Sequence, residues 1–87
     1  MSFSIEFGSH AVKFLSKLDY QIKDRLREKI EKLREDPFPQ EVERVKGYKV
    51  EKVFRIRVGD YRILYIVSFE RSEILVAMID KRERAYD

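Results

Sequence analysis

The chain has 87 residues, enough for a single domain with one modest hydrophobic core. It holds no cysteine and a single histidine, His10, which excludes disulfide scaffolds, thiolate metal sites and a histidine pair for proton relay. Its formal net charge of +3 arises in the second half, because residues 1–43 hold 8 basic and 9 acidic side chains whereas residues 44–87 hold 11 and 7.

The first half predicts one strand followed by two helices. Ser2 to Phe7 alternates between apolar and polar side chains, as a half-buried strand does. Residues 11–18 then carry apolar side chains at i, i+3, i+4 and i+7, the spacing of one buried helical face. A second apolar stripe runs from Ile22 to Leu33 along an otherwise charged segment, and the prolines after Asp36 end that helix.

The second half predicts three strands. Val53–Val58 and Tyr61–Phe69 flank Gly59-Asp60, a two-residue hairpin signal, because glycine takes a positive φ at no steric cost. Ile74–Ile79 is apolar on both faces, which places it inside the sheet with a helix over at least one side. We therefore expect one α+β domain over residues 1–87, in the order β-α-α-β-β-β, with two helices on one face of a mostly antiparallel four-stranded sheet.

The predicted hairpin places arginines opposite one another. With a two-residue loop, Arg57 faces Arg62 and Arg55 faces Leu64, while the intervening apolar side chains point toward the helices. Like charges directly opposite each other destabilise a sheet, so we expect an anionic ligand to compensate. From Arg44 to Arg62 the chain holds seven basic and two acidic residues, a density that favours a phosphate-bearing partner.

These segments resemble the RelE/ParE toxin superfamily of bacterial and archaeal toxin–antitoxin systems, and most closely its archaeal RelE-like members. The resemblance covers nearly the whole chain and is carried by AVKFLSKL, the basic turn Val45 to Gly47, the block FRIRVGDYRILY and the C-terminal KRERAY. It implies a ribosome-dependent endoribonuclease that cuts mRNA in the ribosomal A site and is neutralised by a cognate RelB-like antitoxin. ParE-like members share much of the hairpin, and the alternative they imply is a non-catalytic inhibitor of a protein such as DNA gyrase.

The resemblance also implies which residues form the site. Arg55 and Arg57 fall where related toxins place two basic residues of the active strand, and Arg62 corresponds to a phosphate-binding arginine. Arg82 corresponds to the C-terminal catalytic arginine and Tyr86 to a tyrosine that contacts substrate. Further contacts with RNA are expected from four basic residues: Arg84, Lys46, Lys81 and Lys49. Well-studied bacterial relatives carry lysines where this chain has Arg55 and Arg57.

That difference matters for the chemistry. Metal-free RNA cleavage needs an activated 2′-hydroxyl, positive charge in the transition state and a proton for the leaving oxygen. Arginine meets the second need, because its forked donors match phosphate oxygens and stay charged. Its pKa above about 12 makes it a poor base, so the base stays open among Lys46, Lys81, Glu83 and Tyr86. We expect neither a metal nor a small-molecule cofactor, and slow or no cleavage of RNA that the ribosome does not position.

Two other interpretations of the basic residues are consistent with the charge alone. The arginines could be surface charge on a small α+β protein, although the apposition of Arg57 and Arg62 then has no explanation. A general RNA-binding module is the other, and it would need exposed aromatic side chains to stack on bases, for which Tyr86 is the main candidate.

Partners and location follow from the same observations. Leu64 and Ile66 share the open face with the arginines, where they could form the docking groove of the antitoxin or be covered by the C-terminal tail. No apolar run is long enough to span a bilayer, and the N-terminus lacks the features of a signal peptide. We therefore expect a cytoplasmic protein without membrane contact.

Overall fold

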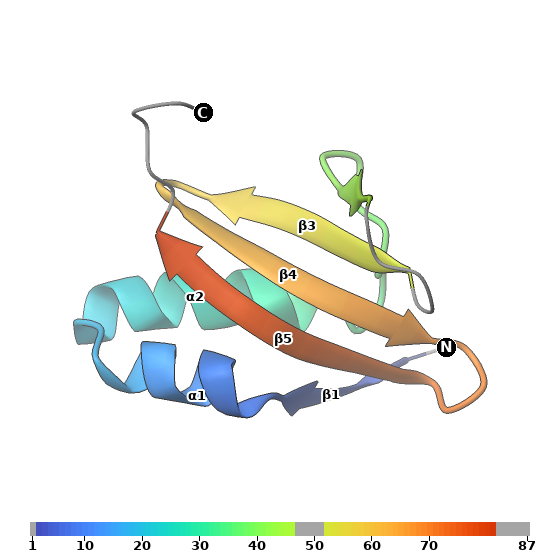
Figure 1. Ribbon diagram of the computed structural model, residues 1–87, viewed down its shortest axis with the longest axis horizontal. Helices are drawn as coiled ribbons and strands as arrows, with labels where there is room; N and C mark the ends of the chain where they lie inside the picture. The colour runs from blue at the N-terminus through green and yellow to red at the C-terminus, as the bar shows by residue number, and fades with distance from the viewer. Residues whose placement is uncertain (1, 47–51, 82–87) are drawn as a thin grey trace.

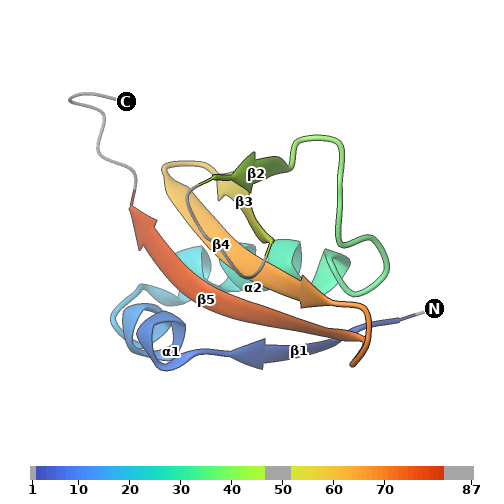
Figure 2. The ribbon, with the colours of Figure 1, turned by 45° about the vertical axis from the view of Figure 1, so that its right-hand side comes forward.

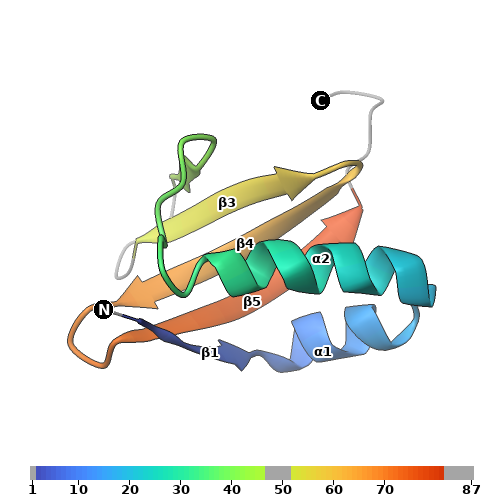
Figure 3. The ribbon, with the colours of Figure 1, turned by 180° about the vertical axis from the view of Figure 1, so that it is seen from behind.

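The computed structural model describes residues 2–46 and 52–81, which form two helices and one five-stranded sheet. The helices are α1 (Ser9–Ser16) and α2 (Tyr20–Lys32). The strands are β1 (Ser4–Phe7), β2 (Glu43–Val45), β3 (Val53–Val58), β4 (Tyr61–Ser68) and β5 (Glu73–Lys81). Both helices lie on one face of the sheet (Figure 1), as the view from behind also shows (Figure 3).

The predicted α+β fold is confirmed, but the sheet has five strands rather than four. Its order is β1-β5-β4-β3-β2, and the additional strand is β2, which pairs antiparallel with β3. A strand of three residues is too short to show an alternation that separates it from a loop. β1 runs parallel to β5 and the other pairs are antiparallel, so the sheet is mixed.

The predicted strands differ from the observed ones only at their ends. β3 has the predicted bounds, β4 ends one residue earlier, and β1 begins at Ser4 rather than Ser2. β5 is longer than predicted at both ends and lies between β1 and β4, as expected for a strand that is apolar on both faces. Its register with β4 shifts at Ala77, and this bulge lets both Val76 and Ile79 reach the helix side.

The hydrophobic core lies between the sheet and the two helices. Ala11 of α1 is fully buried, as are Leu26 and Ile30 of α2. The strands contribute apolar side chains from the helix side of the sheet, and the fully or almost fully buried ones are Ile56, Ile63, Tyr65, Ile74, Val76 and Ile79. Burying a side chain of this size stabilises the fold by roughly 1.5–3 kcal/mol, so the register of the sheet is set by its helix side.

Tyr65 fixes the connection between α2 and β2 to the sheet. Its buried hydroxyl donates a hydrogen bond to the carbonyl of Pro37 at 2.6 Å. The next residue, Phe38, packs edge-on against Phe54 with ring centroids 4.8 Å apart. Burial raises the pKa of Tyr65 well above its ordinary value, and the nearby carboxylates of Asp36 and Glu41 add to the shift. This connection leads from the end of α2 to β2 (Figure 2), so Tyr65 also places the edge strand beside the arginines.

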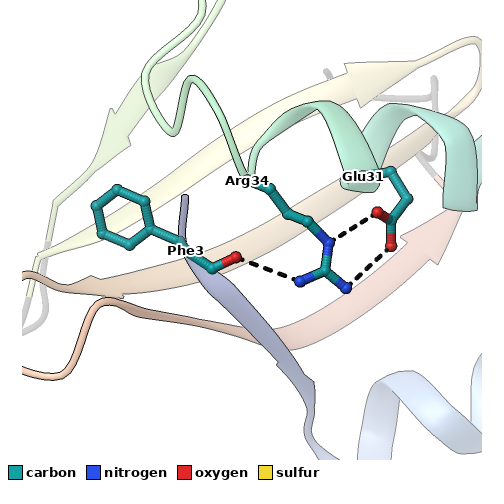
Figure 4. Close-up of polar contacts among 3 residues, drawn as sticks. All are labelled: Phe3, Glu31 and Arg34. Carbon is teal, nitrogen blue, oxygen red and sulfur yellow. Dashed lines mark hydrogen bonds and ion pairs between the residues drawn. The ribbon is translucent and has the colours of Figure 1, made fainter. Parts of the chain in front are cut away.

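Arg34 ties the start of the other edge strand to the end of α2. Its Nε and Nη2 donate to the two carboxylate oxygens of Glu31 at 2.7 and 3.2 Å, and its Nη1 donates to the Phe3 carbonyl at 3.3 Å (Figure 4). The hydrogen bond from Arg34 holds the pKa of Glu31 below its usual value. The Phe3 amide in turn donates to the Arg34 carbonyl at 2.9 Å. β1 is thereby anchored where it enters the sheet.

Candidate nucleic-acid interface

Arg55, Arg57 and Arg62 lie on the sheet face opposite the helices, and we call them the arginine cluster. The register pairs Arg57 with Arg62 and Arg55 with Leu64, as the two-residue hairpin predicted. Gly59 has φ 61°, a conformation that glycine adopts without strain and most other residues rarely adopt. Since the side chains that alternate with the cluster are in the core, the arginines point away from the helices.

Two arginines of the cluster are paired with acidic residues of neighbouring strands. Arg62 donates from Nε to Oδ1 of Asp80 at 2.8 Å, and Asp80 is also its register partner in β5. Arg55 donates to Oε1 of Glu43, its partner in β2, from Nη2 at 2.5 Å and from Nε at 3.2 Å. These carboxylates hold the guanidinium groups in place and offset part of the repulsion between Arg57 and its neighbours.

Arg57, Arg62 and Asp80 form a row across β3, β4 and β5. Neighbouring strands lie about 4.8 Å apart, so the row spans about 10 Å between its outer Cα atoms. Arg62 stands in the middle, with a like charge on one side and an opposite charge on the other. The row can receive an anion from the open side of the sheet, because no described helix covers it (Figure 1).

Asp80 and Glu43 were not among the site residues predicted from the sequence. The last predicted strand stopped at Ile79, which left Arg62 without a partner in β5. Continuing the alternation beyond Met78 by two residues would have placed Asp80 on the face of the arginines. Nothing in the sequence pointed to Glu43, because its strand was not predicted.

Lys46 lies apart from the row of Arg57 and Arg62. It follows β2, whose last residue, Val45, pairs with Val53. Val53 is four residues from Arg57 along β3, a separation of about 13 Å at 3.3 Å per residue. The sheet therefore does not bring Lys46 to that row.

Lys81 is at the end of β5 and belongs by register to the helix side of the sheet. It pairs with Tyr61, whose ring packs edge-on against Phe14 of α1 at 6.1 Å. The remaining predicted site residues, namely Arg82, Arg84, Tyr86 and Lys49, lie outside the described residues, as does Glu83.

Arg25 of α2 approaches the same end of the hairpin. Its Nη2 lies 3.2 Å from the position that a Cβ on Gly59 would occupy. The sequence marks this segment only as charged outside its apolar stripe, and helical spacing alone gives no sign that one of its charged residues reaches the hairpin turn. The structure therefore adds a basic residue beside the turn that joins the two arginine-bearing strands.

The rest of the open face is partly apolar. Leu64 and Ile66 are half-buried, and the register places Met78 and Leu75 beside them, the last 36% exposed. A separate groove of about 560 Å³ with an aromatic lining lies beyond Ile66, formed by Phe38, Lys52, Phe54, Ile66, Val67, Ser68 and Phe69. Two of these residues, Phe54 and Val67, pack against the core on the helix side. Phe69 is 67% exposed and Phe38 is 38% exposed, so the groove offers exposed aromatic rings that the sequence did not single out.

Within residues 2–46 and 52–81, no three histidine or acidic side chains lie close enough together to hold a metal ion. In the same part of the chain, no helix has the length and apolar character needed to cross a membrane.

Known proteins share both the sequence pattern and the fold. Residues 5–86 match the family model of the ParE toxin of the parDE type II toxin-antitoxin system. The candidate toxin RelE1 of Methanocaldococcus jannaschii is 33% identical over 89 residues, which cover 99% of this chain and 97% of that protein. A chain of the archaeal RelE-RelB complex from Pyrococcus horikoshii is 28% identical with a TM-score of 0.83, covering 98% of this chain and 100% of that one.

The isolated RelE toxin of E. coli has the same fold, with a TM-score of 0.81 at 23% identity over 98% of this chain and 89% of that one. Since the family model spans nearly all of the sequence and the M. jannaschii relative matches over nearly its whole length, the expected resemblance is confirmed. The chain belongs to the RelE/ParE family of toxins of type II toxin–antitoxin systems.

Proposed function

We propose that this RelE-like toxin is a ribosome-dependent endoribonuclease that inhibits translation by cutting mRNA in the ribosomal A site. The observation that carries the proposal is the apposition of Arg57 and Arg62, with Arg55 beside them, on the sheet face opposite the helices. Asp80 and Glu43 offset only part of the repulsion between these like charges, and an anion bound over the arginines would offset more of it. A phosphate of single-stranded message is such an anion, and the bidentate fork of arginine fits its oxygens.

The proposed reaction is a transesterification within the RNA. The 2′-oxygen attacks the adjacent phosphorus and loses its proton, the bond to the 5′-oxygen breaks, and that oxygen takes up a proton. Arg57 and Arg62 donate hydrogen bonds to the non-bridging oxygens, whose negative charge increases in the transition state. Arg55, held by Glu43, adds positive charge beside them. These steps need no metal ion.

The C-terminal residues supply the remaining catalytic groups in this proposal, including the base. Arg82 acts as the C-terminal catalytic arginine, Tyr86 contacts the substrate and Arg84 binds the RNA backbone, on the strength of their match to the family motif. Lys49 binds the backbone through its positive charge. The positions of Lys46 and Lys81 make both less suitable as the base, because one follows the short edge strand and the other belongs to the helix side. Glu83 and Tyr86 are then the better candidates to accept the 2′-hydroxyl proton.

The proposal implies two macromolecular partners. The ribosome orients the message, since an arginine cluster supplies charge but no base. A RelB-like antitoxin neutralises the toxin, as supported by the RelE-RelB complex among the similar structures. The apolar part of the open face around Leu64 and Ile66 is its proposed docking surface. Both partners place the protein in the cytoplasm.

The ParE description of the matching family model supports a second candidate function. In that case the chain would bind a protein target such as DNA gyrase and catalyse nothing. A purely protein-binding surface has no need for guanidinium groups that converge in one row, which is why the ribonuclease is preferred.

Primer extension on a defined mRNA in a translating extract separates the two candidates. The wild type should produce cuts at codon steps, and Arg62→Ala should reduce them about a hundredfold, because one transition-state donor is lost. Arg71→Ala is the matched control, since it removes the same charge from a turn residue whose side chain is 76% exposed. It should cut like the wild type, and added antitoxin should stop the cutting by both.

Intact message with wild type and control, in an extract matched to the source organism, would overturn the ribonuclease proposal. A DNA supercoiling assay with gyrase would then be the test of the second candidate. Equal cutting by Arg62→Ala and Arg71→Ala would instead remove the arginine cluster from the mechanism.

A further inference from the structure

We propose that Asp80 is a positioning residue that holds the Arg62 guanidinium in the orientation in which it meets the scissile phosphate. The inference rests on the proposed ribonuclease function and assigns a role to a carboxylate that the function alone does not require. It is carried by the contact of Arg62 Nε with Asp80 Oδ1 at 2.8 Å, between register partners on adjacent strands.

The location of Asp80 needs an explanation, because a carboxylate beside a phosphate-binding site repels the ligand. At this distance the repulsion weakens RNA binding and opposes the negative charge of the transition state. A carboxylate at this position favours catalysis only if its orientation of Arg62 stabilises the transition state by more than its own negative charge destabilises it.

The contact can improve that geometry in two ways. An arginine side chain has large rotamer freedom, and a fixed bond at Nε removes part of it before the substrate binds. Asp80 accepts a hydrogen bond from Nε, which is one of several donor nitrogens of the guanidinium group. This contact does not itself use the terminal Nη1 and Nη2 groups, which can also donate to phosphate oxygens. Asp80 thus directs the guanidinium without blocking it.

The second effect concerns Arg57 on the other side of Arg62. Directly opposed residues of antiparallel strands have Cα atoms only about 4.5–5.5 Å apart, so Arg57 repels the Arg62 guanidinium. Asp80 attracts it from the opposite side of the row. The side chains of Arg62 and Asp80 are 32% and 33% exposed, so solvent screens this pair less than an open surface pair. The orientation of Arg62 is therefore set across three strands.

The test compares Asp80→Ala with Glu73→Ala, a matched control on the same strand and the same face. Glu73 pairs with Arg71 at 3.5 Å, so its removal deletes one carboxylate and one ion pair far from the arginine cluster. On ribosome-bound message, Asp80→Ala should lower kcat about 10- to 100-fold, as expected when a catalytic group is misplaced. KM should stay the same or fall, because a repulsive charge is gone. Asp80→Asn, which keeps an oxygen to accept from Nε, should recover part of kcat.

The result that would contradict the positioning role is a cleavage rate that rises, rather than falls, when Asp80 is removed. If Asp80 only repels RNA, Asp80→Ala will cut faster than the wild type and Asp80→Asn will cut equally fast. Either that outcome, or unchanged kcat in Asp80→Ala, would overturn the positioning role. Thermal unfolding of each variant shows whether a lost activity reflects a lost fold.

A second measurement does not depend on cleavage. In ¹⁵N NMR spectra, the Arg62 Nε–Hε signal should be protected from exchange in the wild type and in Glu73→Ala, and lost in Asp80→Ala. A wild type that cuts no message refutes the proposed function, whatever this signal does. A wild type that cuts, but whose Arg62 signal and kcat are both insensitive to Asp80, refutes the positioning role alone.

Discussion

Arg55 and Arg57 determine what the proposed site can do chemically. Arginine as a residue type is a permanent cation with forked donors, so it suits the stabilisation of a phosphate transition state and is a poor proton acceptor. A lysine at either position could titrate and serve as a base. The proposed toxin therefore depends more on positioning by its ribosomal substrate than a lysine-bearing relative would.

Single residues of the cluster were predictable, and their partners were not. Arg57 and Arg62 follow from the alternation of two strands around Gly59-Asp60, which fixes their register without any tertiary information. Asp80 and Glu43 reach the same face through pairings with other strands. Those registers depend on a bulge and on a very short strand, neither of which leaves a pattern in the sequence.

Tyr65 offers a prediction at the scale of one hydroxyl group. Tyr65→Phe should lower the free energy of unfolding by about 1–3 kcal/mol at pH 7, because the buried Pro37 carbonyl loses the donor that lies 2.6 Å away. Urea unfolding measures the change. Tyr20→Phe is the control, since its ring is 77% exposed, and it should change stability by less than about 0.5 kcal/mol.

The same residue predicts a pH dependence. Burial raises the pKa of Tyr65 in the folded state above the ordinary value of 10.0, so the folded state retains a proton that the unfolded state loses. The stability contributed by the neutral hydroxyl is complete below pH 10 and is lost as pH rises through the folded pKa. Above pH 10, wild-type stability should fall more steeply than that of Tyr65→Phe. Equal slopes would contradict the assigned burial.

At the scale of elements, the hairpin of β3 and β4 is the part that sequence predicts best. Its register and all but one of its strand ends agree with the prediction, because the glycine in the turn and the alternation from Phe54 to Val58 act locally. β2 escaped prediction because Glu43–Val45 becomes a strand only by pairing with β3. Local patterns thus define the arginine-bearing strands, and tertiary pairing supplies the acids around them.

The turn gives a prediction for the whole hairpin. Gly59→Ala should destabilise the protein by about 1–2 kcal/mol, because φ 61° brings a Cβ too close to the following carbonyl. The added Cβ would also lie 3.2 Å from Arg25 Nη2. Gly59→Asn should lose less, since asparagine tolerates this conformation. Chemical unfolding of the two variants checks the order, and a smaller loss in alanine than in asparagine would show that backbone strain is not the cause.

At the scale of the molecule, the two faces of the sheet have different roles. The helix side carries the core that stabilises the fold, whereas the opposite side carries the arginine cluster and the apolar residues beside it. A period of two along β3 and β4 therefore encodes both stability and the proposed site in the same residues. A slip of the register by one residue would bury arginines and expose the core, so the fold and the site are specified together.

The most direct test of the account is the cleavage of one defined mRNA by the purified toxin, with and without purified ribosomes that hold it in the A site. Because arginines supply charge but no base, we predict cuts at codon steps with ribosomes and a rate at least about a hundredfold lower on free RNA. Digestion of the free message at a similar rate would contradict the account, since the chain would then carry a complete catalytic site of its own.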